Sequence, residues 1–251
     1  MTDINQSNLL KNFPDIIHGF STAKDGNMSF VWGEKSEVIN NRRKYLQQFD
    51  IDLKNCVMMH VEHKDEIKIT QECDKISGIL DQETACKIDA LMTNKPDICL
   101  CLLTADCLPI IFYDQKKKII ALGHMGWQGT DQKLSQKIIK KMENDFRSEP
   151  KDILVAIGPG IHKESYIFTR PVAQEDKPEW RPYLTELPEK KLAIDIISYN
   201  FDQLLKSGIS PDNIEISPID TFKDQNTYSH YRSLKNSEPE GRFMTIIKFS
   251  N

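Results

Sequence analysis

The chain has 251 residues, of which 39% are hydrophobic and 28% charged, with a formal net charge of -4 and a pI near 5.9. This length and composition predict one globular domain, residues 1–251, with a sizeable core. The acidic balance argues against a nucleic-acid-binding surface, which is normally basic, and no segment reaches the ~18 consecutive apolar residues of a membrane helix.

The N-terminus and the cysteines predict a cytoplasmic protein. Residues 1–15 lack the apolar core of a signal peptide. All six cysteines lie in the first half of the chain without a CxxC pair, whereas a secreted scaffold spreads paired cysteines along its length. We therefore expect reduced thiols, with Cys99 and Cys101 of the run ICLCLL as small buried strand residues.

In chain order, helical and strand-like patterns alternate. A first helix is indicated around Val38, Tyr45 and Leu46. Apolar runs typical of strands then cover 57–63, 98–103, 108–113, 119–124, 152–158, 214–219 and 243–249. Residues 134–146 have helical periodicity, with Thr130 as the expected N-cap. The proline-rich segment 169–190 is expected to be a surface excursion, followed by a helical pattern over 192–205.

The connections between these elements predict the fold class. Several neighbouring strands are joined by links too short for a crossover, so their pairing should be antiparallel. We therefore expect an α+β fold: a single layered αβ sandwich domain with mixed, largely antiparallel sheets.

The stretch from Thr104 to Thr130 combines a cysteine and a histidine in a predicted hairpin. If the turn is centred on Gln115-Lys116, Cys107 lies directly opposite His124, with Cβ atoms roughly 4.5–5.5 Å apart. Such a pair suits either a shared metal ion or a Cys–His nucleophile. A turn shifted by one residue would remove the opposition.

Two further features bear on this site. After His124, the sequence MGWQGT passes through glycines into a helix start, where backbone N–H groups favour an anion such as phosphate. A third ligand could come from His60 or His63, which face opposite ways if both lie on a strand. The residues alone favour neither histidine.

Read together, these segments resemble the laccase-domain, YfiH-like family, whose members carry the labels purine nucleoside phosphorylase, polyphenol oxidase and peptidoglycan editing factor. The resemblance covers about residues 17 to 249 and includes the blocks HGFSTAKDG, VINNRRKYL, VEHKDEI, DALMTN, TADCLPIIFYD, GHMGWQGT, IGPGIHKESY, LAIDIISYNFDQLLKSGI, DTFKD, YSHYR and GRFMTII. The spacing of TADC-P and H-GW-GT is its most specific part.

The resemblance implies a mononuclear metal site, with zinc as the first choice and copper as the second. Its ligands would be His63, Cys107 and His124, with His60 as the alternative to His63. Three protein ligands with an open fourth position are typical of a catalytic zinc. The resemblance also implies substrate-binding roles for Asn41, Arg42, Tyr166, Arg232 and Arg242.

Several positions depart from the family pattern. Gln128, Ala23 and Tyr231 stand where the family has arginines, and Ser165 replaces a frequent cysteine. The expected metal ligands are all present while cationic positions are lost. Metal binding is therefore the firmer expectation and phosphate use the weaker one.

The expected function is a zinc-dependent purine nucleoside phosphorylase that cleaves adenosine, inosine or methylthioadenosine with phosphate. Adenosine deaminase activity would be linked to it, since zinc lowers the pKa of an attacking water toward ~7. Alternatives are a Cys107–His124 hydrolase or amidase editing peptidoglycan precursors, a copper polyphenol oxidase, and a non-catalytic protein that keeps its metal as a strut. The partners would be a nucleoside and phosphate, without nucleic acid or membrane, in a monomer or homodimer.

Overall fold

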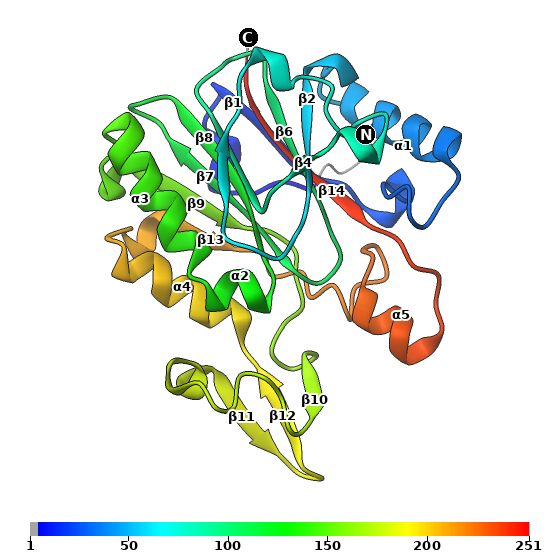
Figure 1. Ribbon diagram of the computed structural model, residues 1–251, viewed down its shortest axis with the longest axis vertical. Helices are drawn as coiled ribbons and strands as arrows, with labels where there is room; N and C mark the ends of the chain where they lie inside the picture. Colours follow the sequence, from blue (N-terminus) through cyan, green and yellow to red (C-terminus); the bar gives the residue numbers. More distant parts are fainter. Residues whose placement is uncertain (1–4, 251) are drawn as a thin grey trace.

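The computed structural model describes residues 5–250, and two β-sheets packed face to face form its centre (Figure 1). The first sheet has the order β1 (Ile16–Phe20), β14 (Phe243–Phe249), β6 (Cys99–Thr104), β2 (Cys56–His60), β4 (Cys86–Lys87). The second has the order β13 (Ile214–Ile216), β9 (Ile153–Ile157), β7 (Leu108–Asp114), β8 (Ile119–Met125), β5 (Ala90–Thr93), β3 (Ile67–Ile69).

Strand alternation divides the apolar residues among three layers. Leu100 and Leu102 of β6 point into the layer between the sheets, where they meet Leu122 of β8. Cys99 and Cys101 therefore point to the opposite face, which is covered by α1 (Lys35–Gln47). The second sheet is covered on its outer face by α3 (Leu134–Phe146) and α4 (Ile196–Lys206) (Figure 1).

This arrangement confirms the predicted fold class. Helices cover both outer faces of a pair of sheets, and seven of the eleven strand pairings in the described part of the chain are antiparallel. The parallel pairings are those of β2 with β4 and β6, β3 with β5, and β13 with β9. Within residues 5–250, the helices include none that could cross a membrane.

The segment predicted as a surface excursion contributes to a small sheet of its own. It consists of β10 (Ile167–Thr169), β12 (Lys191–Ile194) and β11 (Leu184–Leu187), and it extends from the body at the bottom of Figure 1. Trp180 is fully buried and packs edge-on against Tyr199 of α4, with ring centroids 4.9 Å apart. This contact anchors the segment to the body.

Some predicted boundaries are wrong. The helix expected over 192–205 begins at Ile196, capped by Asp195, because the preceding residues pair as β12. Thr130 is not an N-cap: it lies inside α2 (Trp127–Asp131), and Lys133, with φ +59°, separates α2 from α3. The remaining helix, α5, covers His230–Asn236.

Candidate metal centre

The hairpin of β7 and β8 has a different register from the predicted one. His124 pairs with Pro109, not with Cys107. The turn lies one residue later because Asp114 accepts hydrogen bonds from the backbone N–H groups of Lys116 and Lys117. The predicted direct opposition is therefore wrong. A shift of two positions in the partner nevertheless leaves Cys107 and His124 on the same face.

Cys107 and His124 still meet, and Gly126 leaves the space between them. The Cys107 sulfur and the His124 ring lie close enough to interact. A Cβ built on Gly126 would lie 2.9 Å from Cys107 Sγ and 3.7 Å from His124 Nε2. A glycine is thus needed here for close approach of the two donor groups.

His63 reaches the same place from the loop after β2. The strand ends at His60, so strand alternation does not decide between the two histidines. His63 has φ +60°, and its ring lies edge-on to that of His124, with centroids 5.3 Å apart. His60 instead lines a separate pocket. The structure therefore brings His63, and not His60, to His124.

Asp89 positions both histidines, and the sequence reasoning missed it. Its carboxylate accepts hydrogen bonds from the backbone N–H groups of Glu62, His63 and Lys64, at 2.9–3.2 Å, and so holds the left-handed loop. It also lies 3.2 Å from Nδ1 of His124. With Nδ1 engaged, Nε2 of His124 is the ring nitrogen left for a ligand. The quoted block DALMTN contains this residue.

The electrostatics follow from burial and these contacts. Burial lowers the pKa of His124, but the Cys107 thiol and the hydrogen bonds to Asp89 and Cys107 raise it to about 9. Burial raises the pKa of Asp89, and its hydrogen bonds from His124 and from the backbone of Lys64 outweigh this and lower the pKa. Burial and the neighbouring His124 lower the pKa of His63.

These residues fit a metal ion. Two imidazoles and a thiol are donors that zinc accepts, and a carboxylate behind a histidine is a common support for such a ligand. Among the residues described, however, only Cys56, Cys99 and Cys101 bring three ligand atoms within 4.8 Å of one another. The donors of His63, Cys107 and His124 are spread more widely, so a bound ion requires at least one side chain to rotate.

Three of the predicted substrate residues have structural partners. Asn41 donates to the carbonyl of Asn27. Arg42 donates to the carbonyls of Met28, Gly78 and Ile79, and Arg232 donates to several carbonyls and to Glu238. Both arginines are buried. Substrate contact by these three residues stays a prediction.

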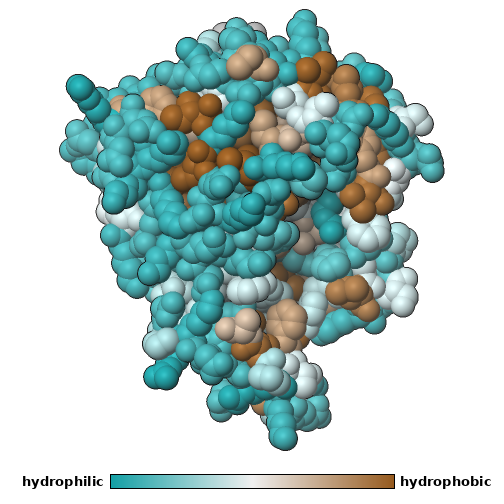
Figure 2. Space-filling model, in the orientation of Figure 1, coloured by the Kyte–Doolittle hydropathy of each residue, from teal (hydrophilic) through white to brown (hydrophobic). Residues whose placement is uncertain are grey.

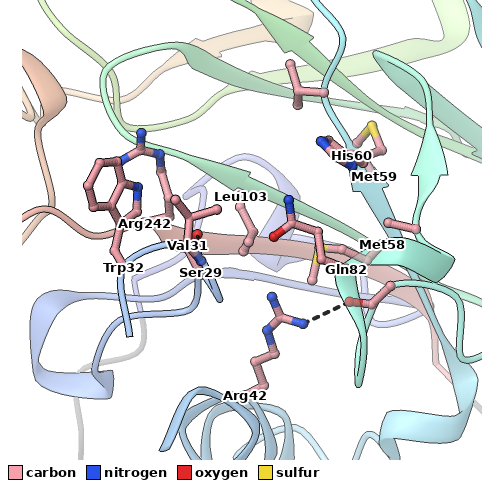
Figure 3. Close-up of a pocket in the computed structure, with 13 residues that line it drawn as sticks. Ser29, Val31, Trp32, Arg42, Met58, Met59, His60, Gln82, Leu103 and Arg242 are labelled. Atoms are coloured by element: carbon pink, nitrogen blue, oxygen red, sulfur yellow. Dashed lines mark hydrogen bonds between the residues drawn. The ribbon is translucent and has the colours of Figure 1, made fainter. Parts of the chain in front are cut away.

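Tyr166 and Arg242 border cavities. Tyr166 lines an aromatic cleft of about 220 Å³ with Trp127 and Phe168, and the Cys107 thiol and Asp106 add to the effect of burial in raising its pKa. Figure 2 shows hydrophobic side chains gathered on a mainly hydrophilic face where the small sheet joins the body. Arg242 lies beside Trp32 at a second cavity of about 300 Å³, with Arg42 at its floor (Figure 3).

Asp106 has a structural role next to Cys107. Its φ is +84°, and its carboxylate accepts hydrogen bonds from the Thr221 hydroxyl and the backbone N–H of Tyr231. It thus ties the turn before Cys107 to the start of α5. The orienting role at His124 belongs to Asp89.

Comparison with known proteins identifies the family of this chain. The family model described as "Multi-copper polyphenol oxidoreductase laccase" matches residues 17–250, so the chain belongs to this family. The resemblance inferred from the sequence is thereby confirmed.

Individual relatives extend the comparison. The chain is 28% identical to purine nucleoside phosphorylase YlmD of Bacillus subtilis over 94% of this chain and 90% of that protein. It is 28% identical to adenosine deaminase RL5, from an unknown prokaryotic organism, over 55% of this chain and 52% of that protein. The crystal structure of Bacillus licheniformis YfiH superposes with a TM-score of 0.83 at 27% identity, covering 94% of this chain and 93% of the other.

Proposed function

We propose that this protein is a metal-dependent purine nucleoside phosphorylase. In this reaction phosphate replaces the base on the anomeric carbon, so that a purine nucleoside gives the free base and a sugar 1-phosphate. The main support is that Cys107 and His124 come together at Gly126, with the His63 ring against that of His124, beside an aromatic cleft. The name of the Bacillus subtilis relative points to the same reaction.

The aromatic cleft is the proposed site of the purine. Trp127 follows directly after Gly126, and the rings of Tyr166 and Phe168 lie edge to face, with centroids 4.7 Å apart. Flat aromatic faces suit a heterocyclic base, which gains from stacking as well as from burial. A cavity of about 220 Å³ is small for a ligand site, and we assign it to the base rather than to the whole nucleoside.

The metal would be zinc, held by His63, Cys107 and His124. It would supply Lewis acidity, polarising an oxygen of the substrate, phosphate or water. The chain's own groups set the geometry: Asp89 fixes the His63 loop and the orientation of the His124 ring. Arg242 is the one of the predicted arginines that is partly exposed, but it lines the separate cavity with His60, so its contact with phosphate stays a prediction from the family resemblance.

An assay of adenosine and inosine, with and without phosphate and a chelator, tests this proposal. We expect base and ribose 1-phosphate to form only with phosphate, and both to be lost on chelation and in Cys107→Ala. Cys73→Ala, which removes an exposed cysteine, is the control and should retain activity. Inosine formed from adenosine without phosphate would indicate the linked deaminase. Absence of all these products would contradict the proposal.

One observation favours a second function. His124 contacts both Cys107 and Asp89, in the arrangement of nucleophile, base and orienting carboxylate that thiol hydrolases use. A metal-free hydrolase or amidase would lose activity on alkylation of Cys107, would be insensitive to chelators, and would tolerate loss of His63. A metal enzyme would respond to both a chelator and His63→Ala.

A further inference from the structure

A second group of sulfur atoms lies in the core, away from His63, Cys107 and His124. Cys56 of β2 is the register partner of Cys99 on β6, and Cys101 lies two residues further along the same face. All three are fully buried, and Cys99 Sγ and Cys101 Sγ are 3.9 Å apart. The three sulfur atoms all lie within 4.8 Å of one another.

The thiol cluster is surrounded by buried apolar side chains, among them methionines. It lies under α1 in an apolar layer that includes the thioethers of Met28, Met58 and Met244. No further histidine, cysteine or carboxylate of the described residues joins the group. The cluster therefore offers three thiols and, beyond them, only thioether sulfur.

A buried cation lies next to the cluster. Arg42 of α1 is 2% exposed and lies close enough to Cys101 and Cys56 for Coulombic attraction between its guanidinium and their sulfur atoms. Its hydrogen bonds go to carbonyl groups, and its guanidinium lies over the ring of Phe30, 4.1 Å from the centroid, so these partners bring no negative charge. A buried charge is costly unless a counter-charge is near, and thiolates at the cluster provide one.

Arg42 and Met58 also connect the cluster to the surface. Both line the cavity of about 300 Å³ that Trp32 and Arg242 border (Figure 3). Arg42 thus borders the cavity and also lies near Cys56 and Cys101. Movement of this one side chain would open a route for a small ion.

We propose that Cys56, Cys99 and Cys101 form a metal site that binds one Cu(I) ion through three thiolates. With metal–sulfur bonds of about 2.3 Å, three sulfurs around one ion lie roughly 4 Å apart, close to the spacing seen here. Zinc in structural sites takes four ligands, whereas this site has three, and soft thiolate and thioether sulfur selects Cu(I). Binding forms three copper–sulfur bonds, and every cysteine still protonated releases its proton.

The test uses anaerobic titration with Cu(I) against a competing Cu(I) chelator. It is made in Cys107→Ala protein, so that the first centre cannot contribute its thiol. We expect one Cu(I) per chain, and X-ray absorption should show a shell of three sulfur atoms. Adding Cys101→Ala should abolish this binding, whereas adding Cys73→Ser, at an exposed cysteine, should not change it.

Several results would overturn the proposal. Equal Cu(I) uptake after removal of Cys101, a copper shell containing nitrogen or oxygen, or uptake of zinc in preference to Cu(I) would each do so. The absorption measurement needs no change in the core, so it decides the question even if a core variant fails to fold. Phosphorolysis is not needed for any of these readouts, so the site can fail or stand independently of the proposed function.

Discussion

The two cysteine-containing centres of this molecule differ in how the chain builds them. At the first, His63, Cys107 and His124 come from a loop, a turn and a strand end, and both His63 and Asp106, the residue before Cys107, have positive φ. At the second, Cys56, Cys99 and Cys101 lie on regular strands and are fully buried. The first has mixed donors and a cleft beside it, as chemistry on a substrate requires, whereas the second has only sulfur and no direct access.

The difference also concerns what supports each centre. The first depends on Asp89, a buried carboxylate that contacts two of the proposed ligands, the backbone of His63 and the ring of His124. The second is held by sheet register and by packing of α1, with Arg42 as its charged neighbour. Unusual backbone and shared polar supports accompany the proposed catalytic site, while the core site follows from ordinary strand geometry.

The largest effect on metal binding at the first centre is expected when the space at Gly126 is filled. In Gly126→Ala, the added methyl group would lie against Cys107 Sγ, so we expect metal affinity at the first centre to fall by more than about 100-fold, beyond a typical loss from a supporting residue. Metal titration of purified protein measures this. Gln128→Ala, on the same short helix, is the control. Unchanged affinity in Gly126→Ala would exclude the space beside Gly126 as the binding position.

Removing the carboxylate support should have a smaller effect. In Asp89→Asn, the amide cannot accept all the hydrogen bonds that fix the His63 loop and the His124 ring, so we expect a ~10–100-fold loss of metal affinity. Asp65→Asn, at a partly exposed carboxylate paired with Lys137, should retain full affinity. Wild-type affinity in Asp89→Asn would show that the carboxylate does not orient the ligands.

The smallest effect is expected at the core cluster. Cys101→Ala removes one buried sulfur from a close-packed layer, which should lower the free energy of unfolding by about 1 kcal/mol and leave nucleoside cleavage unchanged. Denaturant unfolding and the activity assay measure the two quantities, with Cys73→Ala as the exposed control. Lost nucleoside cleavage in a folded Cys101→Ala protein would mean that the two centres are not separate.

Local patterns predicted much of the fold. The strands β6, β7, β8 and β14 follow from their short continuous apolar runs, because they are buried on both faces, and the helix α3 follows from its helical apolar periodicity. The face shared by Cys107 and His124 was also predictable, since it depends only on the parity of the register. The exact register was not predictable, because the hydrogen bonds from the backbone N–H groups of Lys116 and Lys117 to Asp114 place the turn one residue later.

Long-range neighbours were beyond the sequence. Cys56 and Cys99 meet because β2 pairs in parallel with β6, and nothing local indicates this. Asp89 contacts His63 and His124, which lie 26 and 35 residues away in the sequence, and only the assembled sheets bring these residues together. The resemblance selected His63 over His60, and the structure shows why: the strand ends before His63, so its direction is set by the loop and by Asp89.

The central claim, a metal held by His63, Cys107 and His124, is tested most directly by metal analysis of the native protein beside Cys107→Ala. The two samples should be purified identically, and zinc and copper should be counted per chain in each. We predict about one zinc per chain in the native protein and a large loss of zinc in the variant. Equal zinc in both proteins would contradict the assignment of this centre.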